Sequence, residues 1–124
     1  MSPRHFLTTE EWTRQELQLV LDRARAFKQG SDSSRSMQGK SIALLFFNPS
    51  LRTRTSFELG AFQMGGHAVV LQPGKDAWPM EFELGTTMDG EAEEHVKEAA
   101  QVLSRYCDLI AVRAFPKFTD WEHD

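Results

Sequence analysis

Cysteine is almost absent from this sequence, and long apolar runs are absent altogether. The one cysteine, Cys107, cannot form a disulfide within the chain, and its place after a helical apolar stripe favours a small buried residue over a reactive thiol. No stretch reaches the roughly 18 apolar residues that a membrane-spanning helix needs, and the N-terminus has no apolar signal core. We therefore expect a cytoplasmic protein with no membrane partner.

Positive charge is also in short supply. Lys and Arg number 14 against 18 Asp and Glu, which gives a formal net charge of −4. This balance argues against a broad surface for nucleic acid or anionic lipid, so any anion site has to be local. The apolar share of 40% and the charged share of 26% are those of an ordinary globular protein. We predict that residues 1–124 form a single domain that is incomplete at its C-terminus.

Apolar periodicity predicts an α/β fold. Residues 13–29 have helical spacing and begin with the capping-box sequence Thr-Arg-Gln-Glu. Residues 41–47 form a continuous apolar run, which is typical of a strand buried on both faces. The remaining segments alternate: a helix over 52–64, a strand over 67–72, a helix that opens at Asp89 or Glu91, and a strand over 108–113. The predicted architecture is a three-layer parallel sheet with a β-α-β-α-β core, preceded by a helix.

Ligands of such a sheet bind beyond the carboxyl ends of its strands, where three loops qualify: 48–55, 72–78 and 113–118. The first loop places Ser50, Arg52 and Thr53 at the start of a helix. Cations cost about 0.3–1 kcal/mol at that end of a helix dipole, so the arrangement becomes favourable when an anion is bound. A phosphate would accept bonds from the helix N–H groups, the hydroxyls and the guanidinium.

The same segment is also compatible with purely structural roles. Ser50 can act simply as a helix N-cap, and Arg54 can simply pair with Glu58 four residues later. A P-loop is excluded, because no glycine-rich stretch precedes a Lys-Ser or Lys-Thr pair. His67 and His95 lack the close spacing of a metal-ligand set, so neither a metal nor a cofactor is expected.

Residues 47–58 read Phe-Asn-Pro-Ser-Leu-Arg-Thr-Arg-Thr-Ser-Phe-Glu, and they resemble the Ser-x-Arg-Thr-Arg signature for carbamoyl phosphate in aspartate and ornithine carbamoyltransferases. The resemblance extends over residues 5–113 and implies the carbamoyl-phosphate-binding domain of that fold. It implies a phosphate site made by the signature and the end of the third strand, from Ser50, the backbone of Leu51, Arg52, Thr53 and Arg113. Arg52 and Arg113 are the expected catalytic residues, with a surface salt bridge as the alternative for Arg113.

The second loop is similar to one branch of this family. The aspartate enzymes carry a lysine there that reaches the neighbouring subunit's site, whereas this chain reads Asp-Ala-Trp-Pro over residues 76–79, as in the enzymes that act on N-acetylornithine. The resemblance implies a homotrimer in which Trp78 reaches the carbamoyl phosphate of the neighbouring subunit. An exposed loop aromatic or an ordinary interface anchor is the alternative. Glu93 is expected to help select the acetyl over the succinyl substrate, unless it only begins a helix.

The implied reaction is attack by the δ-amine of N-acetylornithine on the carbamoyl carbon, with phosphate leaving and N-acetylcitrulline formed for arginine biosynthesis. The chain stops before the His-Pro-Cys-Gln type motif of the family and before its amino-acid-binding domain. Little or no transferase activity is therefore expected from these 124 residues alone. Two alternatives remain: a carbamoyltransferase for ornithine or N-succinylornithine, and a non-catalytic phosphate-binding or oligomerising module.

Overall fold

The computed structural model describes residues 4–82, 85, 87–88, 90 and 94–116. The chain divides into two compact units, Met1–Ser34 and Arg35–Asp124. The assignment of both units to a single domain stays a prediction.

The first unit contains a short 3-10 helix, η1 (Thr9–Glu11), and one long helix, α1 (Arg14–Gln29). The capping box at the start of α1 is confirmed. The Thr13 hydroxyl accepts the Glu16 N–H at 3.1 Å, and the Glu16 carboxylate accepts the Thr13 N–H at 2.8 Å. The helix ends at Gly30, whose φ of 76° is readily adopted by glycine.

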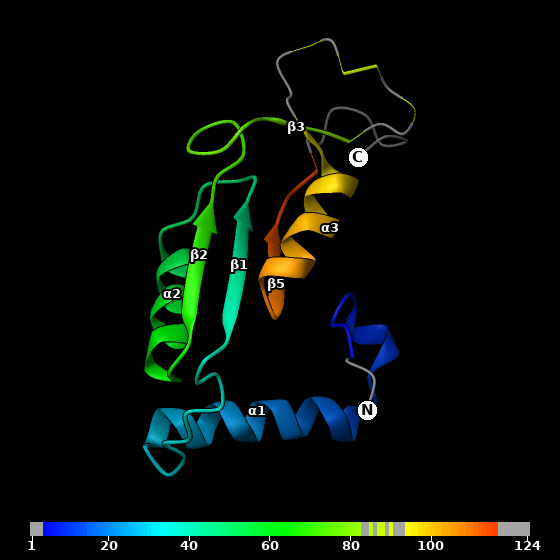
Figure 1. The fold of residues 1–124 in the computed structure, drawn as a ribbon. Coiled ribbons are helices and arrows are strands. Elements are labelled where there is room, and N and C mark those ends of the chain that lie inside the picture. The colour runs from blue at the N-terminus through cyan, green and yellow to red at the C-terminus, as the bar shows by residue number, and fades with distance from the viewer. Residues whose placement is uncertain (1–3, 83–84, 86, 89, 91–93, 117–124) are drawn as a thin grey trace. The chain divides into compact units, whose positions relative to one another are not determined.

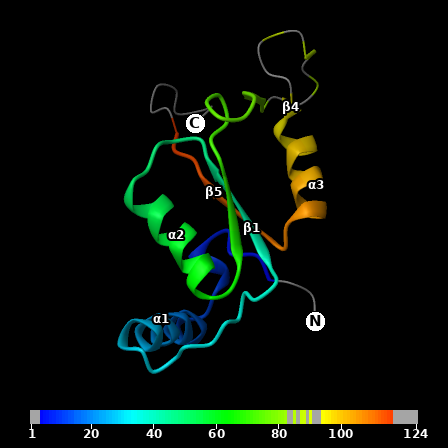
Figure 2. The same ribbon diagram turned by 60° about the vertical axis from the view of Figure 1, so that its left-hand side comes forward.

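The second unit is built on a parallel sheet in the order β2-β1-β5. Its elements follow the chain as β1 (Ser41–Phe46), α2 (Arg52–Gln63), β2 (His67–Leu71), β3 (Met80–Glu81), β4 (Glu94–His95), α3 (Val96–Tyr106) and β5 (Leu109–Arg113). Helices α2 and α3 lie on opposite faces of the sheet (Figure 1, Figure 2). The predicted β-α-β-α-β core with three layers is therefore confirmed.

The core of this unit is centred on β1, the middle strand. Four consecutive β1 residues, Ala43 to Phe46, are buried, as the continuous apolar run predicted. Such a run is expected where helices cover both faces of a parallel strand. Because β1 pairs along its length with β2 and β5, the carboxyl ends of all three strands meet at one edge of the sheet.

A glycine pair lies between the end of α2 and the start of β2. Gly65 has a φ of 86°, which favours glycine, and the Gly66 N–H donates to the Ala61 carbonyl at 2.8 Å. A Cβ on Gly66 would lie 2.9 Å from the Met37 Cβ, so the backbone approaches too closely for any side chain. The turn therefore fixes where β2 enters the sheet after α2.

The prediction that the last helix opens at Asp89 or Glu91 is wrong. Helix α3 begins at Val96, and Glu94 and His95 before it form β4, which pairs in parallel with β3. The His95 backbone is extended, and its imidazole Nδ1 accepts the Lys97 N–H at 3.1 Å, so a histidine caps the helix where an acidic turn was expected. Asp89 and Glu91 themselves lie outside the described residues. Within the described ranges no helix is both long and apolar enough to cross a membrane.

The N-terminal segment is fastened to the start of α1 by Arg4. The Arg4 guanidinium carbon lies 3.7 Å from the centroid of the Trp12 ring, and the guanidinium donates to the Glu16 carboxylate. This hydrogen bond, followed by the one from the Thr13 backbone, lowers the pKa of Glu16 to about 2. Because the pKa is lower in the folded chain, the contact stabilises the fold above the ordinary glutamate pKa. That contribution disappears as the pH falls toward 2.

We expect Arg4→Ala to raise the pKa of Glu16 toward its ordinary value, because the largest stabiliser of the carboxylate is removed. The measurement is an NMR titration of the Glu16 side-chain carboxyl carbon from pH 7 down to about pH 2. Arg14→Ala is the matched control, since it removes the same charge from the adjacent helix start. An unchanged Glu16 titration in Arg4→Ala would show that the contact does not hold in solution.

Candidate functional site

The loop between β1 and α2 carries the predicted anion-binding residues at the carboxyl edge of the sheet. The Ser50 hydroxyl oxygen accepts the Thr53 N–H at 3.1 Å, so Ser50 does act as a cap for α2. That bond uses the oxygen as an acceptor and leaves the hydroxyl proton as a donor. The first N–H groups of a helix have no intrahelical partner, so those of Leu51 and Arg52 are suited to an anion.

Arg113 reaches this loop from the end of β5. Parallel pairing places Arg113 beside Phe46, the last residue of β1. Its Nη1 donates to the Thr53 hydroxyl oxygen at 3.5 Å, a long bond across 60 residues of sequence. Its Nε is buried and has no hydrogen-bond partner among the described residues. A cavity of about 260 Å³ adjoins this pair, lined also by Phe57 and Phe115.

The two arginines of the Arg-Thr-Arg segment differ in their surroundings. Arg54 Nε lies 3.9 Å from Glu58 Oε2, so the predicted alternative of an i, i+4 pair is confirmed for Arg54. Arg52 is exposed, and the described part of the chain provides no ion pair for it or for Arg113. The structure therefore places Arg113 beside Thr53 at the start of α2, where Arg52 is the first helical residue. An anion would supply acceptors to these donors.

Trp78 is carried by a closed turn. The Asp76 and Ala77 N–H groups both donate to the Gln72 carbonyl, and the Gly74 N–H donates to the Ala77 carbonyl at 2.9 Å. The Asp76 carboxylate in turn accepts the Gln72 N–H at 2.6 Å. These bonds close the turn that directly precedes Trp78.

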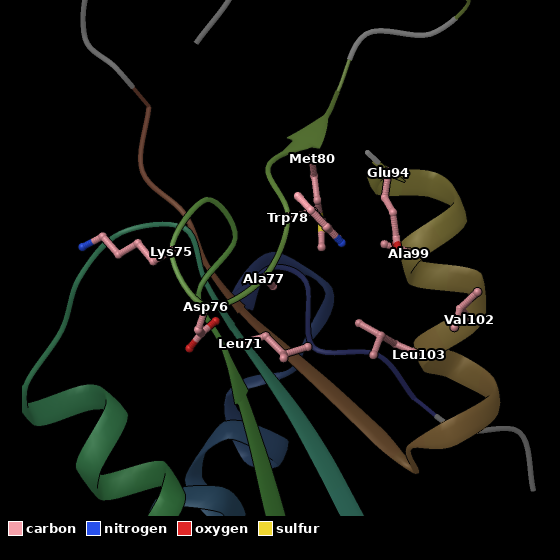
Figure 3. A pocket seen from close by; sticks show the side chains of 10 residues that line it. All are labelled: Leu71, Lys75, Asp76, Ala77, Trp78, Met80, Glu94, Ala99, Val102 and Leu103. Atoms are coloured by element: carbon pink, nitrogen blue, oxygen red, sulfur yellow. The ribbon is translucent and has the colours of Figure 1, made fainter. Parts of the chain in front are cut away.

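The structure does not bring Trp78 to the Thr53–Arg113 pair. The Trp78 side chain is 63% exposed and, with Met80, faces α3 across a cavity of about 560 Å³, while Lys75 points away from it (Figure 3). The cavity is otherwise lined mainly by apolar side chains, among them Leu71, Ala99 and Leu103. Glu93, the residue expected to select the acyl group, lies outside the described residues.

Sequence reasoning missed two residues that shape these loops. The Asn48 side chain accepts the Phe115 N–H at 2.7 Å, and Asp76 closes the turn before Trp78. Both residue types carry a general signal, since Asn and Asp in turns and loops often bond backbone groups. What the sequence could not show was that the partner of Asn48 lies 67 residues away.

Within the part of the chain that is described, no group of three or more His, Cys, Asp or Glu side chains is placed to hold a metal ion. His67 is exposed at the start of β2, and His95 caps α3.

Comparison with known proteins gives consistent matches. Residues 4–123 match the family described as aspartate/ornithine carbamoyltransferase, carbamoyl-P binding domain. N-acetylornithine carbamoyltransferase of Xanthomonas campestris pv. campestris is 67% identical over 124 residues, which is 100% of this chain and 36% of that protein. N-succinylornithine carbamoyltransferase of Bacteroides fragilis is 42% identical over 87 residues, 70% of this chain and 27% of that protein.

A solved structure shows the same likeness in three dimensions. The crystal structure of acetylornithine transcarbamylase complexed with acetylcitrulline superposes with a TM-score of 0.91 at 66% identity. The match covers 98% of this chain and 36% of that one. The chain thus spans little more than a third of the length of the relatives that it matches throughout.

Proposed function

Because the chain belongs to the aspartate/ornithine carbamoyltransferase family through the carbamoyl-phosphate-binding domain, we propose that it is the carbamoyl-phosphate-binding part of an N-acetylornithine carbamoyltransferase. The longer protein would transfer the carbamoyl group of carbamoyl phosphate to the δ-amine of N-acetylornithine. The products would be N-acetylcitrulline and phosphate, in arginine biosynthesis.

One observation carries the anion-binding part of this proposal. The Nε of Arg113 is buried and has no acceptor within the described part of the chain, and it lies beside the Thr53 hydroxyl at the start of α2. A buried charged donor left without a partner costs about 1–3 kcal/mol or more, so the site favours a ligand that supplies acceptor oxygens. A phosphate group has enough oxygens to bond this donor, the hydroxyls and the helix N–H groups together.

The roles of the residues follow from their donors. Ser50, Thr53 and the Leu51 N–H would hold the phosphate group, and Arg52 would bind two of its oxygens with a planar fork. Arg113 would bind both the phosphate and the carbamoyl oxygen. Attack by the amine places negative charge on the carbonyl oxygen and then on the departing phosphate, so donors fixed at these two positions lower the barrier. The reaction needs no covalent intermediate with the protein.

The choice of amine rests on the second loop and on the relatives. Residues 76–79 read Asp-Ala-Trp-Pro, the sequence that resembles the N-acetylornithine enzymes. The N-acetylornithine enzyme of Xanthomonas campestris pv. campestris is also more similar to this chain, at 67% identity, than the N-succinylornithine enzyme of Bacteroides fragilis, at 42%. We propose that the protein is a cytoplasmic homotrimer in which Trp78 closes the neighbouring subunit's site and that Glu93 excludes a longer acyl group. The exposed position of Trp78 on a closed turn supports a contact with a second chain.

Carbamoyl phosphate is expected to bind this chain with an affinity that falls about 10- to 100-fold in Arg52→Ala and in Arg113→Ala, since each loses a charge-assisted contact. Isothermal titration calorimetry of the purified chain measures this affinity for the wild type and each variant. Arg54→Ala is the matched control, because it removes the same charge from the same helix turn but from an arginine that pairs with Glu58. Equal weakening in all three variants would point to a general charge effect and against a built site.

For the longer protein we expect kcat/KM to be highest with N-acetylornithine. Ornithine should be poorer by about a hundredfold or more, because it lacks the acyl group and carries an additional charged amine. The preferred substrate is identified by measuring product formation at a fixed concentration of carbamoyl phosphate with each amine in turn: N-acetylornithine, N-succinylornithine and ornithine. A preference for N-succinylornithine or ornithine would reassign the substrate and leave the anion site as proposed.

A mixing experiment tests whether Trp78 acts on the neighbouring subunit. Arg52→Ala and Trp78→Ala versions of the longer protein should each have little activity. Random mixed trimers should regain about a quarter of the wild-type sites, because one site in four then combines an intact Arg52 with an intact Trp78 from its neighbour. No recovery in trimers shown to be mixed would mean that Trp78 acts within its own subunit.

A further inference from the structure

We infer that Asn48 is a positioning residue for the anion site: its side chain holds the end of the β1–α2 loop against the end of β5, and this sets where Arg113 lies relative to Thr53. The inference deepens the proposed function and rests on it. Asn48 lies just after β1, is half-buried, and precedes Pro49.

The hydrogen bond of Asn48 continues the β1–β5 ladder beyond the point where the strands separate. The Phe47 N–H donates to the Arg113 carbonyl at 3.0 Å, one step past the last paired residues. In a regular parallel ladder the next bond would join the Phe115 N–H to the Phe47 carbonyl. Here the Phe115 N–H donates to Asn48 Oδ1 at 2.7 Å. A side-chain carbonyl thus takes the place of a main-chain carbonyl.

Because a side chain makes this bond in place of the main chain, the segment after β1 can turn away while the segment after β5 stays attached. The chain after β1 has to leave the sheet to begin α2 at Arg52. A main-chain bond at this point would require the two backbones to continue side by side. The Asn48 side chain bridges the growing separation, so the segment after Arg113 remains attached to the loop that carries Ser50.

The effect on Arg113 is direct. Its carbonyl is bonded to Phe47, and two residues later the Phe115 N–H is bonded to Asn48, so the backbone is held on both sides. The Phe115 ring centroid lies 4.5 Å from the guanidinium carbon of Arg113. A guanidinium donates in fixed directions, and a misplacement of about 1 Å in a binding group is enough to weaken what it does.

A second clamp on the same strands separates positioning from general stability. At the opposite end of β1 and β5, Asp108 Oδ2 accepts the Ser41 N–H at 2.9 Å. This bond, like that of Asn48, joins a side chain to a backbone N–H across 67 residues. The Asp108 clamp lies at the amino end of the strands and away from the Thr53–Arg113 pair. Asp108→Ala is therefore a matched control for Asn48→Ala.

The test is calorimetric titration of the chain with carbamoyl phosphate, combined with thermal unfolding. Both alanine variants should lower the Tm, but only Asn48→Ala should weaken binding, by about three- to tenfold. Equal binding by Asn48→Ala and the wild type overturns the inference, and so does equal weakening by Asp108→Ala. A wild-type chain that is folded and binds nothing overturns the proposed anion site as well, so the two failures are distinguishable.

A double-mutant cycle shows whether Asn48 acts through Arg113. Asn48→Ala should weaken binding in the wild-type background but should add little in an Arg113→Ala background, because the group that it positions is then absent. The same loss in both backgrounds would contradict the inference.

If Asn48→Ala does not fold, Asn48→Asp replaces it. Its carboxylate keeps an acceptor for the Phe115 N–H, and high salt screens the added charge. Beside the wild type in the same high-salt buffer, Asn48→Asp is expected to bind within about twofold, since its position-setting bond is retained. A larger loss under these conditions overturns the inference.

Discussion

Parallel pairing of β1 with a strand on each side is the interaction on which the rest of the second unit depends. Four consecutive buried residues make β1 the centre of the core, and its register fixes both neighbours. The same register brings the end of β5 to the end of β1, although Phe46 and Arg113 are far apart in sequence. The proposed anion site therefore depends on sheet pairing, because its loop follows one strand and the Arg113 guanidinium ends the next.

Local charge at this edge runs against the charge of the whole chain. The net charge of −4 gives no general attraction for anions, yet Arg52 and Arg113 lie at the carboxyl edge of the sheet with no carboxylate partner in the described residues. The helix dipole of α2 adds positive potential at the same place. An anion site here would discriminate through the geometry of its donors, because the net charge of the chain adds no long-range attraction.

The sequence predicted the features that depend on neighbours in the chain. The capping box of Thr13 and Glu16 and the buried run of β1 both follow from patterns within a few residues, and each is confirmed. The placement of Arg113 beside the loop of residues 48–55 was also predictable, because the carboxyl ends of parallel strands lie at one edge of the sheet.

The features that were predicted wrongly or missed depend on partners that are distant in the sequence. The start of α3 was placed too early because acidic residues suit a helix dipole, whereas pairing of Glu94 and His95 with a distant segment keeps that stretch extended. Asn48 was missed for the same reason, since its acceptor role depends on a backbone N–H that only the folded sheet brings near. Local propensity is overridden where a long-range partner contributes more.

The closed turn before Trp78 has a consequence for association. Ordering a flexible loop on binding costs conformational entropy for every residue that it fixes, and that cost reduces the affinity gained from contact. Here the bonds to Gln72 fix the turn before any partner arrives, and tryptophan itself has only two side-chain torsions to restrict. A surface that covers Trp78 would therefore lose less of its contact free energy to ordering this loop.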